Sequence, residues 1–118
     1  MSAFSTNNFD SISRGRKIQS ALIGTSNSVL YTVPSGKRCM VVGINLANEH
    51  TAATTVSLYH VRPTETASTK SALYYGMTIA TASVTQDDAP KYLAAGDQLI
   101  ASCSTGSHVC ITVYGIED

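Results

Sequence analysis

Residues 29–48 constrain the fold of this chain most, because they hold two β-type runs joined by a tight turn. The first run, 29–33, ends at Pro34, and the sequence PSGK over residues 34–37 combines a preset φ with a glycine that tolerates positive φ. The second run, 40–48, alternates with a period of two, as expected for a strand with one buried face. The alternation puts Met40, Val42, Ile44 and Leu46 on one face, and Val41, Gly43, Asn45 and Ala47 on the other.

Further β-type runs follow along the chain at a spacing of about 8–12 residues, with turn residues between them and no helical period. Gly76 predicts a bend or bulge between two short strands, 73–75 and 77–80. This pattern predicts an all-β fold, an antiparallel, jelly-roll-like β-sandwich of about eight strands. The expected strands cover residues 17–24, 29–33, 40–48, 53–62, 71–80, 82–86, 98–103 and 108–117.

The 118 residues suit a single domain, with residues 17–118 as the sandwich. Residues 1–16 are polar and without periodicity, so we expect a flexible N-terminal arm that becomes ordered on a partner or a neighbouring subunit. Its two phenylalanines, Phe4 and Phe9, are either anchors that bury in a neighbour or simply exposed residues. Arg14, Arg16 and the adjoining Lys17 form a small basic cluster that is either a solvated face or a contact to an acidic partner surface.

The charge of the chain excludes some partners. Eight basic and eight acidic residues give a net charge of zero, which argues against binding to nucleic acid or to an anionic membrane. Only 14% of the residues are charged, below the roughly 25% usual for soluble domains. Such a surface fits a protein that works inside an assembly rather than a free monomer. The chain shows no signal peptide and no membrane-spanning run, so we expect synthesis in the cytoplasm without export.

The side chains that carry chemistry form no recognisable site. Cys39, Cys103 and Cys110 are odd in number and widely spaced, which favours buried free thiols, with a disulfide between Cys103 and Cys110 as the alternative. The three histidines lack metal-ligand spacing. Asp87 and Asp88 suit a turn, with a weak cation site that includes Asp97 as the alternative. No serine lies in a nucleophile elbow and no glycine loop for phosphate is present. We therefore expect no enzyme, no cofactor and no metal.

Six tyrosines and no tryptophan make tyrosine the main aromatic residue of the chain. Tyr59 and Tyr114 alternate with the apolar residues of their strands, so they either line an outer face that binds protein or cap the ends of the sandwich. The residues that we predict for an interface are Phe4, Phe9, Arg14, Arg16, Tyr59 and Tyr114.

Three segments together resemble small β-sandwich virion proteins of tailed bacteriophages. They read LYTVPSGK (30–37), LAAGD (93–97) and VYGIE (113–117), and the likeness in order and spacing extends over residues 17–118. The resemblance implies a non-enzymatic capsid decoration (cement) protein on the virion surface. Such a protein binds the major capsid protein, often as a homotrimer, with an N-terminal arm that reaches onto a neighbour. Only the turn residues Pro34, Gly36, Gly96 and Asp97 match residue by residue, and their role is to shape the fold.

Two other functions stay open from the sequence. The chain could be a neck, tail or fibre-attachment component of the virion, present in few copies. It could also be a host-receptor or carbohydrate-binding module, although the absence of tryptophan counts against sugar stacking.

Overall fold

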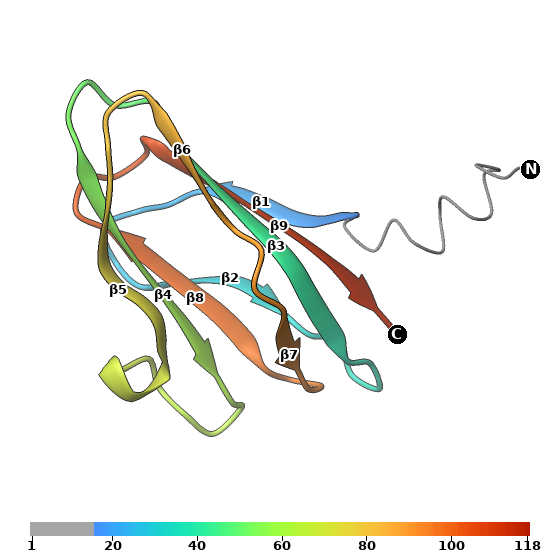
Figure 1. Cartoon of the computed structure of the whole chain (residues 1–118). Coiled ribbons are helices and arrows are strands. Elements are labelled where there is room, and N and C mark those ends of the chain that lie inside the picture. Colours follow the sequence, from blue (N-terminus) through green and yellow to red (C-terminus); the bar gives the residue numbers. More distant parts are fainter. Residues whose placement is uncertain (1–15) are drawn as a thin grey trace, which may run out of the picture.

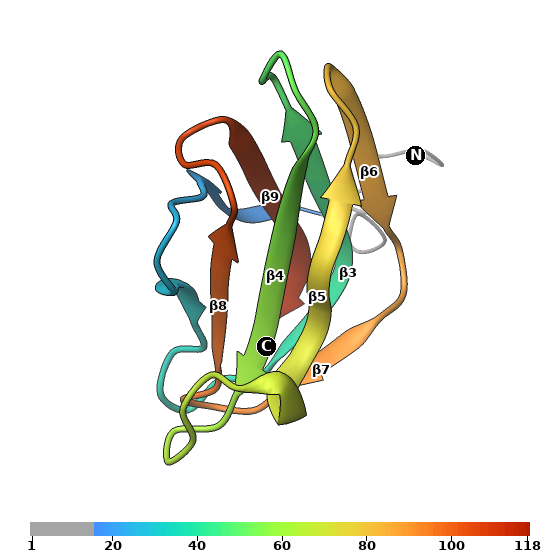
Figure 2. The ribbon, with the colours of Figure 1, turned by 90° about the vertical axis from the view of Figure 1, so that its left-hand side faces the viewer.

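The computed structural model describes residues 16–118 as two antiparallel β-sheets packed face to face (Figure 1). Sheet A has the order β1-β9-β3-β6, with β7 also paired to β3, and sheet B has the order β2-β8-β4-β5. Figure 2 shows sheet B in front of sheet A. The elements are β1 (Lys17–Leu22), β2 (Ser28–Thr32), β3 (Cys39–Asn48), β4 (Thr54–Val61), the 3₁₀ turn η1 (Thr69–Ser71), β5 (Ala72–Ile79), β6 (Ser83–Asp87), β7 (Lys91–Leu93), β8 (Gln98–Cys103) and β9 (Val109–Glu117).

The strand pairing is that of a jelly roll. The first strand pairs with the last, β2 with β8, β3 with β6 and β7, and β4 with β5, so the chain forms nested antiparallel pairs. Both β6 and β7 pair with β3, and they therefore form one jelly-roll strand that is interrupted at residues 88–90. The prediction of an all-β, jelly-roll-like sandwich is confirmed, and eight strands become nine through this interruption. The sequence pattern missed β7 as a strand.

A bulge in β3 corrects the predicted faces of this strand. Val41 pairs with Gly115 and Gly43 pairs with Tyr114, so Val42 is the extra residue. An extra residue shifts the alternation by one, and side chains before and after it change faces relative to a regular strand. Met40 and Val42 therefore do not share a face with the buried Ile44 and Leu46, as we had predicted. The inward residues of β3 are Cys39, Val41, Ile44, Leu46 and Asn48.

The hydrophobic core fills the space between the two sheets. Complete burial of an aliphatic side chain stabilises a fold by about 1.5–3 kcal/mol, so these residues supply the main driving force. Most of them come from β3, β4, β8 and β9, which are the central strands of the two sheets. The largest of the fully buried side chains are Ile44, Leu46, Leu58, Ile79, Leu93, Leu99 and Ile111.

The two turn motifs noted in the sequence contact each other. Gly36 adopts φ +75° in the turn after β2, and Gly96 adopts φ +85° in the turn before β8. The amide of Val33 donates to the carbonyl of Asp97 at 2.9 Å, and the amide of Gly96 donates to the carbonyl of Val33 at 3.0 Å. A side chain at Gly96 would also approach Cγ of Pro63 to 2.9 Å. Both glycines are thus needed for backbone geometry.

Polar side chains join the two sheets at one end of the sandwich. Tyr31 of β2 donates its hydroxyl hydrogen to the carboxylate of Glu117 on β9. Burial, together with this hydrogen bond, raises the pKa of the Tyr31 hydroxyl, and burial also raises the pKa of the Cys39 thiol beside it. The phenol thus stays protonated and keeps its hydrogen bond across the sheets.

A second cluster joins the sheets along their open edge, between β5 and β6. Tyr74 of β5 donates its hydroxyl hydrogen to Asp87, and Nζ of Lys91 lies 2.7 Å from Oδ2 of Asp87. Burial alone would raise the pKa of Asp87, but the hydrogen bonds from Lys91 and Tyr74 outweigh it and lower the pKa. Asp87 therefore stays ionised between Tyr74 and Lys91, and its bond to Tyr74 connects β6 of sheet A to β5 of sheet B.

Candidate protein-binding surface

The outer face of sheet A carries three rows of side chains that run across its strands. Directly paired residues of antiparallel strands project on the same face, so the pairing identifies the members of each row. The upper apolar row consists of Leu22, Cys110, Ala47 and Val84; the polar row of Ser20, Thr112, Asn45 and Gln86; and the lower apolar row of Ile116, Met40 and Tyr92.

The apolar rows are open to solvent in the described part of the chain. Leu22 is 59% exposed and Val84 is 58% exposed at the two ends of the upper row, and Tyr92 is 71% exposed at the end of the lower row. None of the three rows contains a charged residue. Exposed apolar side chains that gather on one face are typical of protein-binding sites.

The bulge in β3 builds the lower row. Because Val42 is an extra residue, Met40 projects outward, between Ile116 of β9 and Tyr92 of β7. These three side chains line an open, mainly apolar depression of about 590 Å³. A regular strand would turn Met40 toward the core and remove the middle of this row.

Tyr114 lies on this face, as the sequence predicts. The strand β9 alternates throughout, with Val109, Ile111 and Val113 buried, and Tyr114 is half-buried between the polar row and the lower apolar row. Arg16 is exposed at the first described position, and its carbonyl accepts a hydrogen bond from the amide of Gly115 at 2.9 Å. The structure therefore brings Tyr114 and Arg16 near each other at β9.

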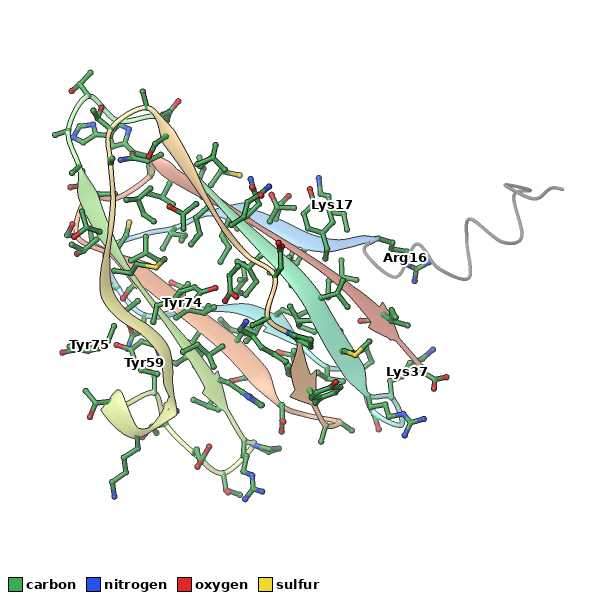
Figure 3. The ribbon with its side chains drawn as sticks, viewed as in Figure 1. Arg16, Lys17, Lys37, Tyr59, Tyr74 and Tyr75 are labelled. Atoms are coloured by element: carbon green, nitrogen blue, oxygen red, sulfur yellow. The ribbon has the colours of Figure 1, made fainter. Side chains whose placement is uncertain are left out.

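Tyr59, unlike Tyr114, is not accessible for contact with a partner. It lies outside the core cluster, as its alternation with the inward Leu58 predicts, but its side chain is only 7% exposed. Val61, on the same face, is fully buried. The segment that connects β4 to β5 through η1 lies beside this end of sheet B and beside Tyr59 (Figure 3). Sequence alternation identified the outward direction of Tyr59 and missed the loop that covers it, so Tyr59 offers no free contact surface.

The remaining predicted interface residues, Phe4, Phe9 and Arg14, lie outside the described residues. Tyr75, which we had not selected, is 68% exposed on the sheet B side of the molecule, away from Arg16 and Lys17 (Figure 3).

The structure pairs His60 with Asp97, a contact that no sequence pattern indicated. Nε2 of His60 lies 2.8 Å from Oδ2 of Asp97, and the same oxygen accepts the amide hydrogen of Ala94 at 3.0 Å. Burial would raise the pKa of Asp97, but the bonds from His60 and Ala94 outweigh it and lower the pKa. His60 and Asp97 line a second depression together with Ser71, whose hydroxyl is bonded to Ser68 in a capping box. His60 and Asp97 thus tie β4 to the turn before β8.

The other two histidines also form an unpredicted contact. The rings of His50 and His108 stack with centroids 4.2 Å apart, and Nδ1 of His108 lies 3.4 Å from Oε2 of Glu49. Within residues 16–118, no group of three His, Cys, Asp or Glu side chains has a geometry that could hold a metal ion. The aspartates of the alternative cation site are separated, since Asp87 bonds Lys91 and Asp97 bonds His60.

All three cysteines are free thiols. Cys39 and Cys103 are buried, as predicted, and Cys110 is half-buried on the outer face of sheet A. The alternative disulfide between Cys103 and Cys110 is absent. Across residues 16–118, no helix is both long and apolar enough to span a membrane.

Comparisons of this chain with protein-family models, curated proteins and solved structures found no match. The resemblance to phage virion proteins therefore rests on the three motifs alone.

Proposed function

We propose that this protein is a non-enzymatic structural component of a tailed-bacteriophage particle, a decoration protein that binds the major capsid protein on the outside of the shell. In this role it assembles as a homo-oligomer, a trimer by the resemblance, and strengthens the shell by burying surface across neighbouring capsid subunits. Jelly rolls occur in viral capsid proteins, lectins and enzymes, so the fold by itself does not indicate this function.

The observation that carries the proposal is the set of three uncharged, partly apolar rows on the outer face of sheet A. Leu22 and Val84 leave more than half of their side chains in solvent, at the two ends of one row. On the sheet B side, Tyr59 and Val61 are covered, while Val29 and Tyr75 are exposed on its two edge strands, β2 and β5. Apolar rows that extend across several strands suit contact with a protein surface. The zero net charge agrees with a protein partner rather than a nucleic acid.

The first test is the copy number in purified particles, measured by quantitative mass spectrometry against the major capsid protein. A decoration protein spread over the shell gives a ratio near one, or one copy for every few capsid subunits. A small fixed number of copies per particle would refute decoration and assign the protein to the neck, tail or fibre attachment. Absence from particles would refute the assignment to a virion.

The second test places charges on the upper apolar row. The double variant Leu22→Asp with Val84→Asp should lower the affinity for shells that lack the protein by about thirtyfold, the effect of losing about 2 kcal/mol at an interface. Tyr75→Asp is the matched control, since Tyr75 is equally exposed but lies on the sheet B side. Equal loss in the control, or full binding by the double variant, would contradict the assignment of this face.

A further inference from the structure

Two depressions meet at β7. The first is the apolar depression lined by Met40, Tyr92 and Ile116, and the second, of about 450 Å³, is lined by His60, Arg62 and Lys70. Tyr92 and Ala94 belong to both, so the exposed ring of Tyr92 stands between them. One ligand can therefore contact an apolar and a polar site at the same time.

The second depression is lined by charges of both signs, Arg62 and Lys70 together with Glu65 and Asp97. Arg62 and Lys70 form no close ion pair with any residue of 16–118, whereas Arg38 at the first depression pairs with Asp118 at 3.1 Å. Oε1 of Glu65 accepts the amide hydrogen of Arg62, and Asp97 bonds His60, while the charge of Arg62 also helps to lower the pKa of Asp97. Exposed guanidinium and ammonium groups that form no close ion pair can bind a carboxylate ligand.

The strand between the depressions is free on one side. β7 pairs with β3 alone among the described strands, so it lies at the edge of sheet A. An extended peptide can add to such an edge through main-chain hydrogen bonds, with pockets for its side chains providing specificity. A free phosphate or a small acid would satisfy Arg62 and Lys70 but would leave the apolar depression beside Met40 unfilled.

We propose that the two depressions together bind an extended segment of the protein partner, which has an apolar residue close to an aspartate or glutamate. The apolar side chain occupies the depression of Met40 and Ile116, and the carboxylate binds Arg62 and Lys70 across Tyr92. This inference rests on the proposed function, since it names the part of a capsid partner that this protein recognises.

The direct test is photo-crosslinking from position 92 on assembled particles. A benzoylphenylalanine residue replaces Tyr92, and Tyr75 carries the same replacement in a control, because both tyrosines are exposed but Tyr92 belongs to β7 of sheet A and Tyr75 to β5 of sheet B. We expect crosslinks from position 92 to a particle-protein peptide that holds an acidic residue next to, or one residue from, an apolar one. A peptide without an acidic residue, residues 1–15 of this chain, a second copy of the sandwich, or no crosslink would each overturn the inference.

The second test removes the positive charges of Arg62 and Lys70. Arg62→Gln with Lys70→Gln should weaken binding to shells about tenfold or more and should reduce its dependence on salt, because charge-assisted hydrogen bonds are lost. Lys37→Gln removes an exposed cation that lines neither depression and should bind like the unmodified protein. If the unmodified protein binds shells and the double variant binds equally well, the inference is refuted while decoration stands. If the unmodified protein does not bind shells, both are refuted.

Discussion

Gly115 occupies the tightest position in sheet A, and adding a single methyl group there tests how the sheet is packed. A Cβ at this position would lie 2.7 Å from the carbonyl oxygen of Met40 and 3.3 Å from both Cδ1 of Ile18 and Cα of Val41. The nearest of these atoms belongs to the backbone of the paired strand β3, which cannot rotate away as a side chain can. Gly115→Ala must therefore push β3 and β9 apart beside the bulge at Val42.

The cost follows from overpacking. Forcing an extra methyl into a well-packed site costs about 1–3 kcal/mol. An unfolding entropy of about 2.1 cal/mol/K per residue gives about 0.25 kcal/mol/K for this chain length. The melting temperature should therefore fall by about 4–12 °C, measured by calorimetry or circular dichroism at one fixed protein concentration.

Gly24→Ala is the matched control. No atom lies within 4 Å of a Cβ at Gly24. Here the methyl group mainly restricts the unfolded chain, so stability should stay the same or rise by up to about 1 kcal/mol. If Gly115→Ala melts within about 2 °C of the unmodified protein, less than half of the smallest expected shift, the close approach of β3 and β9 is refuted.

Three further predictions address the core, the acid stability and the thiols. Leu46→Ala, at a fully buried position, should cost about 2–5 kcal/mol, measured by the urea midpoint; an unchanged midpoint would contradict its place in the core. The pKa of Asp97 is lower in the folded chain, so its carboxylate stabilises the fold above the unfolded pKa of about 3.9; this contribution declines as pH falls below that value and is lost once pH has fallen through the lower folded pKa. Asp97→Asn should thus lose less stability between about pH 5 and about pH 3 than the unmodified protein, and an equal loss would be evidence against this role. Cys110 is half-buried, while Cys39 and Cys103 are buried, so a thiol reagent should modify Cys110 first in the native protein; simultaneous reaction of all the thiols would refute this arrangement.

Local signals in the sequence predicted the fold class and most strand positions. Alternation and turn residues act over a few neighbouring positions, so the expected strand 98–103 agrees with β8, and the expected 108–117 differs from β9 by one residue. The prediction of a bend or bulge at Gly76 is also confirmed, since this glycine has φ +64° and the pairing of β5 shifts beside it. The predicted division into two short strands was wrong, because β5 continues through the bulge as one strand. The bulge at Val42 was missed, because its cause is the pairing with β9 rather than a local residue pattern.

The candidate surface was predicted only in part. The outward direction of Tyr114 follows from the alternation in its strand, whereas the rows across sheet A depend on which strands are neighbours. The strand order is not encoded in any local pattern, so neither the pairing of Leu22 with Cys110 nor that of Ala47 with Val84 could be read from the sequence.

By itself, the sequence determined that this chain forms β-strands with polar turns around one core, because backbone preferences and period-two burial are properties of short segments. Only the tertiary structure decided which outward side chains are free. Tyr59 is covered by the segment that follows its own strand, between β4 and β5, and Met40 points outward because of the bulge in β3. The tertiary structure also brings His60 into hydrogen-bond contact with Asp97 and places Arg62 and Lys70 beside an apolar depression. These contacts join residues far apart in the chain, and they arise only when the two sheets pack.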